Sequence, residues 1–99
     1  MIAHIVMWRI VATAGKSKAE NVQLVRQKLS ALPEIVPDIK EYEIGLNESD
    51  SGAAYDVVLI SRFASWDDLR RYRQHPDHKR VAEFIAAVRS ESAVADYEY

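Results

Sequence analysis

The chain has 99 residues, 48% hydrophobic and 28% charged, and its 13 basic and 15 acidic residues give a net charge of −2. This length predicts a single domain over residues 1–99. The balanced charge excludes the strongly basic surface that nucleic acid or anionic lipid requires, so neither is an expected partner. The chain lacks cysteine, signal-peptide features and any apolar run of membrane-spanning length, which is typical of a cytoplasmic protein.

The first half of the chain predicts a strand, a helix and a second strand. Residues 2–10 are rich in β-branched and aromatic side chains and predict a strand. Ser17 and Glu20 form a capping-box pattern, in which each side chain accepts a backbone hydrogen bond at the start of a helix. Pro33 marks the expected end of that helix. Residues 40–46 alternate between polar and apolar side chains, which predicts a strand with one buried face.

The second half predicts a strand, two helices and a final strand. Residues 55–63 form the most hydrophobic segment and predict a strand. Ser65 begins a short helix that Pro76 interrupts, and we expect Asp77 to cap the helix that follows. Residues 93–99 alternate again and predict the last strand. The helix after Pro76 has an apolar stripe at helical spacing, formed by Val81, Phe84, Ile85 and Val88.

This order, β-α-β-β-α-α-β, predicts an α+β fold of the ferredoxin-like type, with a four-stranded antiparallel sheet. Helices in such a fold cover one face of the sheet. In residues 4–8 and 57–60, however, apolar side chains point to both faces. An uncovered apolar face would forgo about 25 cal/mol for each Å² left in water. We therefore expect two copies to pack sheet to sheet as a homodimer.

Several segments together resemble the stress-responsive A/B barrel domain family, within the dimeric α+β barrel superfamily. They are IAHIVMWRI, the alternating strand that ends in Gly45, VVLISRF and YRQHPDHKRVAEF. The resemblance covers nearly the whole chain, and Tyr-x-x-His-Pro-x-His is its most specific part. It implies that two ferredoxin-like protomers form a barrel and that each keeps a cavity between its sheet and its helices.

The family includes plant stress proteins with no settled activity and a plant polyketide cyclase that closes a ring by aldol condensation without metal or cofactor. The catalytic tyrosine and histidine of that cyclase match Tyr72 and His78, and its pocket histidine on the first strand matches His4. Arg73 and Gln74 stand where the cyclase has apolar residues. The resemblance therefore implies a related cavity, whereas the substrate and the reaction stay open.

The residues themselves allow a catalytic interpretation of His78. It lies in the first turn of a helix, where the positive end of the dipole disfavours an imidazolium, so a neutral ring could accept a proton. Tyr72 could donate its hydroxyl to a carbonyl oxygen that gains charge. The alternative is structural. His75 could be a cationic residue at a helix end, and His4, on an apolar strand face, could be a hydrogen-bonded core residue.

A metal site at these histidines is disfavoured. His75 and His78 are three residues apart, which would suit one helix face, but Pro76 pushes His75 out of helical conformation. The chain has no thiols and no recognisable cofactor motif. We therefore predict neither a metal nor a cofactor.

The sequence leads to one functional hypothesis and two alternatives. The hypothesis is cofactor-free acid–base chemistry on a small apolar carbonyl compound, polyketide-like in type. The first alternative is a binding module that holds a ligand without catalysis. The second is a stress-associated dimer whose functional property is its stability. Whether the protein is an enzyme stays open. The predicted catalytic residues are His78 and Tyr72, and the predicted ligand-binding residues are His4, Val6, Trp8 and Leu59.

Overall fold

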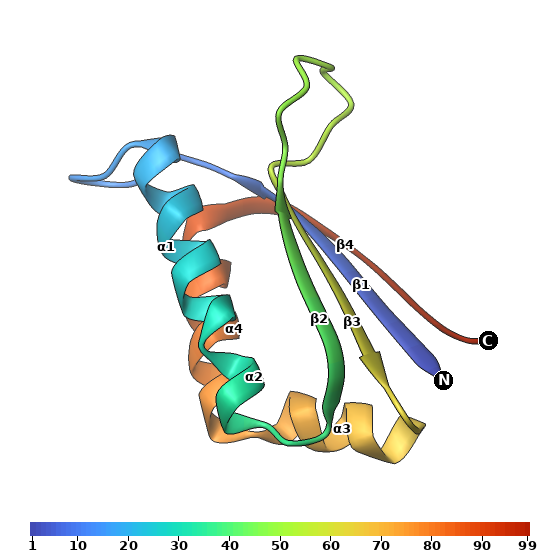
Figure 1. Ribbon diagram of the computed structural model, residues 1–99. Coiled ribbons are helices and arrows are strands. Elements are labelled where there is room, and N and C mark those ends of the chain that lie inside the picture. The colour runs from blue at the N-terminus through green and yellow to red at the C-terminus, as the bar shows by residue number, and fades with distance from the viewer.

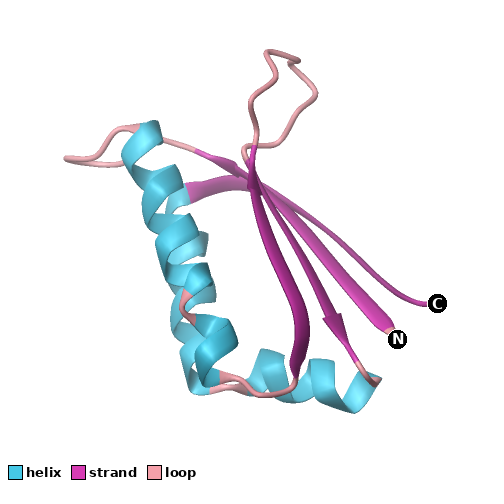
Figure 2. Ribbon diagram, viewed as in Figure 1, coloured by secondary structure: helices cyan, strands magenta, loops and turns pink.

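The computed structural model describes residues 1–99 as two layers, a four-stranded sheet and four helices (Figures 1 and 2). The elements in chain order are β1 (Ile2–Ile10), α1 (Lys18–Ser30), α2 (Leu32–Ile35), β2 (Ile39–Leu46), β3 (Val57–Phe63), α3 (Trp66–Gln74), α4 (Pro76–Val88) and β4 (Arg89–Glu98). The predicted order is confirmed, with the short helix α2 added. None of the helices is both long enough and apolar enough to cross a lipid bilayer.

The sheet is antiparallel throughout, with the strand order β2-β3-β1-β4 of the predicted ferredoxin-like fold. Val6 of β1 lies opposite Leu59 of β3 and Val94 of β4, so these three side chains point to the same face. β1 and β4 also bring the chain ends together. The Met1 amino group donates to the Tyr99 carbonyl at 3.1 Å, and the Tyr99 N–H donates to the Met1 carbonyl at 3.0 Å.

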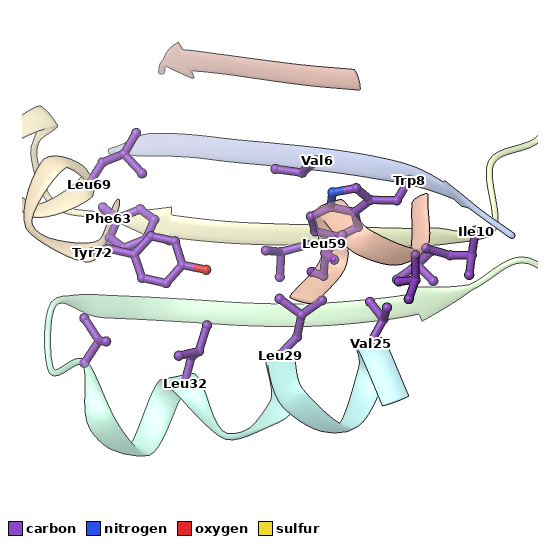
Figure 3. Packing of buried hydrophobic residues seen from close by; sticks show 14 of the residues in the cluster. Val6, Trp8, Ile10, Val25, Leu29, Leu32, Leu59, Phe63, Leu69 and Tyr72 are labelled. Carbon is purple, nitrogen blue, oxygen red and sulfur yellow. The ribbon is translucent and has the colours of Figure 1, made fainter. Parts of the chain in front are cut away.

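All four helices lie on one side of the sheet (Figure 2). Facing them are the even-numbered residues of β1 and the odd-numbered residues of β3, so Ile2, Leu59 and Phe63 are all buried. These side chains belong to a core cluster of 15 buried residues, shared between the sheet and the helices (Figure 3). Successive side chains of a strand point to opposite faces, so every second side chain of β1 and β3 points toward this core.

The other face of the sheet carries no helix, and we call it the outer face. Its centre is apolar, because Ile5 lies opposite Ile60 and Met7 lies opposite Val58. Ile5, Ile60 and Val58 are only partly buried, and Met7 is 36% exposed. The apolar outer face that the sequence predicted is therefore present and incompletely covered within one chain.

The start of α1 was predicted correctly and its end was not. The Ser17 hydroxyl accepts the Glu20 N–H at 3.1 Å, and the Glu20 carboxylate accepts the Ser17 N–H at 3.0 Å. α1 ends at Ser30, three residues before Pro33. Pro33 instead lies in the first turn of α2. Proline is tolerated there, because backbone N–H groups in the first turn make no hydrogen bond within the helix.

The boundary between α3 and α4 also differs from the prediction. The cap of α4 is His75 rather than Asp77, because the His75 ring accepts the Asp77 N–H at its Nδ1 atom, at 3.0 Å. His75 also ends α3, as predicted, because its N–H donates to the Tyr72 carbonyl at 3.2 Å. The Asp77 carboxylate pairs with Arg80 instead. Pro76 follows the cap at the first helical position, which it tolerates well.

Candidate functional site

A cavity of about 350 Å³ lies between the sheet and the helices, where β1 and β4 face α3 and α4. Ten of its 15 lining residues are hydrophobic, and its volume is in the range of small-molecule sites. The helices pack mainly over the other three strands, so the cavity opens toward β4, where Val94 is 57% exposed. All six residues that the sequence singled out lie around this one cavity: His4, Val6, Trp8, Leu59, Tyr72 and His78.

A larger hollow of about 770 Å³ lies between α1 and the end of β2. Polar and charged side chains such as Lys18, Arg26 and Glu48 form much of its wall. It contains no histidine or tyrosine, and Lys18 is already paired with Asp56 at 3.1 Å. The smaller cavity is the better candidate site, because it combines apolar walls with a few converging polar groups.

Tyr72, on the buried side of α3, is completely enclosed. Its ring centroid is 4.5 Å from that of His78, and its hydroxyl is 3.2 Å from the hydroxyl of Tyr42 on β2. Figure 3 shows this hydroxyl pointing into the core. Burial raises the pKa of Tyr72 to about 12, although the hydrogen bond with Tyr42 opposes this change. The hydroxyl is protonated at neutral pH, and with Tyr42 as the donor its own proton is free for a ligand.

His78 lies in the first turn of α4, and its Nδ1 atom is buried without a hydrogen-bond partner. Burial lowers the pKa of His78 below its ordinary value, and repulsion by His4, when that ring is protonated, adds to this effect, while a backbone contact with Arg73 opposes it. The ring is therefore neutral at pH 7, as predicted. The main cause is loss of water around the ring, however, rather than the dipole of α4.

His4 is both a hydrogen-bonded core residue and part of the cavity wall. Its Nδ1 atom lies 2.5 Å from a carboxylate oxygen of Asp96 on β4, and Arg73 pairs with the same carboxylate. Because a carboxylate only accepts, Nδ1 carries the proton and Nε2 keeps a free lone pair. Burial lowers the pKa of His4 and outweighs the hydrogen bond with Asp96, which raises it. His4 is neutral at pH 7, with a fixed tautomer.

Sequence reasoning did not identify Asp96 or Tyr42 as part of this site. Asp96 lies 92 residues from His4 in the chain and meets it because the two residues are opposite each other in the β1–β4 register. Tyr42 was expected to point inward, and it does, but its contact with Tyr72 depends on how α3 crosses the sheet. In the sequence, Asp96 is distinguished only as an acidic residue within the alternating segment 93–99.

Metal ligands do not cluster in this structure. No group of three or more His, Asp or Glu side chains lies in an arrangement that could hold a metal ion. His75 and His78 are directed differently, because the His75 ring caps α4 while His78 lines the cavity. The two histidines of the Tyr-x-x-His-Pro-x-His segment therefore have separate positions.

The chain matches the stress responsive A/B barrel domain family over residues 2–99. An uncharacterized protein of Streptomyces coelicolor is 32% identical over 103 residues, which cover 100% of both chains. A dimeric protein of ferredoxin-like fold from Bacteroides fragilis is 27% identical, with a TM-score of 0.81 over 99% of this chain and 95% of that chain. A dimeric ferredoxin-like protein from Thermobifida fusca is 26% identical, with a TM-score of 0.85 over 99% of this chain and 90% of that chain.

Proposed function

The chain belongs to the stress responsive A/B barrel domain family, and on this premise we propose that it is a homodimer whose cavity acts on a small apolar carbonyl compound. The chemistry is cofactor-free acid–base catalysis of the kind that forms an enolate. The observation that carries the proposal is the convergence of His4, Tyr72 and His78 on one cavity with mainly hydrophobic walls.

The homodimer is proposed to form through the outer face of the sheet. In support, this face has an apolar centre around Ile5 and Ile60 that no element of the same chain covers. Charged pairs lie toward its margins, with Arg62 3.0 Å from Glu41 and the Arg9 side chain 3.3 Å from Glu91. An apolar centre with a polar rim is the usual anatomy of a protein interface. Two solved proteins of similar structure are described as dimeric.

In the proposed reaction, the neutral His78 ring takes a proton from the carbon next to the carbonyl group of the ligand. The electron pair of that C–H bond moves to the carbonyl oxygen, and the Tyr72 hydroxyl donates a hydrogen bond to the resulting enolate. The enolate carbon can then attack a second carbonyl in the same molecule, and His78 returns the proton to the new alkoxide. His4 binds the ligand through its free Nε2 atom.

The main alternative is a ligand-binding protein without turnover. In its favour, the hydroxyls of Tyr42 and Tyr72 already share a hydrogen bond at 3.2 Å. With Tyr72 as the donor in this bond, its hydroxyl has no proton left for a ligand and serves only as part of the cavity wall. In a third possibility, a stress-associated dimer, the same pair would contribute only to stability.

Proton exchange separates these functions without knowledge of the natural substrate. We would incubate 2-octanone, a simple apolar ketone, with the protein in deuterated buffer and follow loss of the protons beside the carbonyl group by NMR. The wild type should accelerate exchange, and H78Q should abolish the acceleration. Y72F should reduce it about 100-fold, the scale of losing one donor to a developing oxyanion. H75N is the matched control, because asparagine also caps helices and His75 does not line the cavity.

The outcomes assign the function. Binding of 2-octanone with no more exchange than in buffer would support the binding protein and contradict the enzyme. Equal exchange rates for wild type and H78Q would remove His78 as the base. If Y72F unfolds while H78Q stays folded, Tyr72 acts mainly in stability, as the third possibility requires.

A further inference from the structure

The polar lining of the cavity contains donors and bases but no carboxylate. Its five polar residues are His4, Arg73, His78, Arg89 and Ser92, and the hydroxyl of Tyr72 adds a sixth polar group. Both histidines are neutral at pH 7, so the two arginines are the permanent charges of this lining. A wall with this composition favours a ligand whose polar atoms are acceptors, with carbonyl or carboxylate oxygens.

The two arginines are in different situations. Arg73 is paired with Asp96, beside His4, so its charge is compensated within the chain. Arg89, the first residue of β4, lines the cavity and takes part in none of the ion pairs of the chain. An unpaired guanidinium beside an apolar cavity is a ready partner for a carboxylate, which it can bind through two parallel hydrogen bonds.

The two charged positions are at opposite ends of the cavity. Asp96 lies opposite His4 in the β1–β4 register, whereas Arg89 lies opposite Ile10. Six residues of strand separate these positions, which is about 20 Å between Cα atoms. The long Arg89 side chain reduces this span, because it reaches the cavity wall. Hydrophobic side chains of α4, including Val81 and Ile85, line the space between the two ends.

We infer that the ligand is an elongated, amphipathic carboxylate, with its carbonyl group at the Tyr72–His78 end and its carboxylate at the Arg89 end. This inference rests on the proposed function of the cavity and adds the ligand class and its orientation. The negative charge of Asp96 disfavours the carboxylate at the His4 end, while Arg89 attracts it to the other. The chain between the two groups contacts the apolar walls.

The test compares two molecules that differ only in the carboxylate, 7-oxooctanoate and 2-octanone. Binding to the wild-type protein would be measured by NMR titration at low salt, with tryptophan fluorescence as a second readout. 7-Oxooctanoate should bind about three- to tenfold more tightly, because Arg89 is exposed and its ion pair is partly screened. R89Q should remove this preference by weakening the binding of 7-oxooctanoate. R26Q is the matched control, since Arg26 also lacks an ion pair but lies on α1, outside this cavity.

Each outcome bears on one of the two proposals. Equal binding of both molecules to the wild type would overturn the carboxylate inference and leave the carbonyl site in place. A preference that persists in R89Q, or disappears in R26Q as well, would also overturn the inference. If neither molecule binds, the proposed function fails together with the inference. A preference that R89Q alone removes, and that decreases as salt is added, supports it.

Discussion

On the helix side of the sheet Leu59 is 2% exposed, whereas the next residue, Ile60, points to the outer face and is only partly buried. The two side chains are almost the same size and belong to the same strand, β3. Leu59 is enclosed by helices of its own chain, but nothing in that chain encloses Ile60. The proposed dimer accounts for this difference, because a second copy would cover the outer face, whereas the helix side is covered by its own chain.

The two faces also differ in chemistry. The three groups proposed to contact the carbonyl end of the ligand, His4, Tyr72 and His78, are on the helix side. The outer face combines aliphatic side chains with ion pairs such as Arg62–Glu41. One face is therefore suited to hold a small molecule and the other to bind a protein surface. Substitutions on the two faces should therefore have different effects, largest at the centre of each face.

An aspartate at the centre of the outer face should disrupt the dimer. I60D would place a charge in the proposed interface, where an unpaired buried carboxylate costs several kcal/mol, so the dimer dissociation constant should rise by more than about 100-fold. Light scattering after size exclusion would then report the 11.3 kDa monomer. A87D is the control, because Ala87 is exposed on α4, away from this face. An intact I60D dimer would contradict the proposed interface.

Truncation on the helix side should cost stability at every protein concentration. L59A removes buried methyl groups from the core and should lower the free energy of unfolding by about 2–5 kcal/mol, as measured by denaturant titration. The companion variant I60A should cost less, and its cost should depend on protein concentration because it acts through the dimer. If both variants showed the same concentration dependence, the division between the two faces would be wrong.

The helix side should also determine how stability depends on pH. The pKa values of His4 and His78 are lowered in the folded chain, so below pH 6.5 the unfolded chain binds more protons. Stability should fall as the pH decreases from 6.5 toward the folded-state pKa values, by at most about 1.4 kcal/mol per pH unit for each histidine. H78Q should reduce this slope, because it removes one of these two groups. A slope unchanged in H78Q would show that its ring is not held neutral.

The smallest effect is expected at the rim of the outer face. Glu41 forms an ion pair with Arg62 at 3.0 Å, but its side chain is 69% exposed. E41Q should therefore change the dimer dissociation constant by less than about threefold, because exposed ion pairs contribute little. Analytical ultracentrifugation of E41Q beside I60D would compare the rim with the centre. A large loss in E41Q would place the interface around this pair.

The strands and the main helices could be predicted because each is specified locally. The period of two in β1 and the capping box of Ser17 and Glu20 require no knowledge of distant residues. The errors arose where two local signals compete. Pro33 fits the end of one helix as well as the first turn of the next. His75 became the cap of α4 through its ring nitrogen, a role more often filled by Asp, Ser or Asn.

The candidate site could be predicted only in part, since its contacts depend on tertiary packing. His4, Tyr72 and His78 were identified through a resemblance, and the structure places them around one cavity. Asp96 and Arg89 could not be identified from the sequence, because their positions depend on the register between β1 and β4, the first and last strands of the chain. No local pattern distinguishes an arginine beside a cavity from one in solvent. The charge pattern of the site therefore required the fold.

The meeting of β1 and β4 at the chain ends has a practical consequence. Met1 and Tyr99 exchange two backbone hydrogen bonds, so a few added residues could join the ends without disturbing the sheet. A circular permutant could then be opened in residues 47–56, the loop that projects beyond the sheet in Figure 1. Such a molecule would keep every strand pair while reversing the order in which the two edges of the sheet are synthesised. It would show whether assembly depends on the order of the chain or only on its contacts.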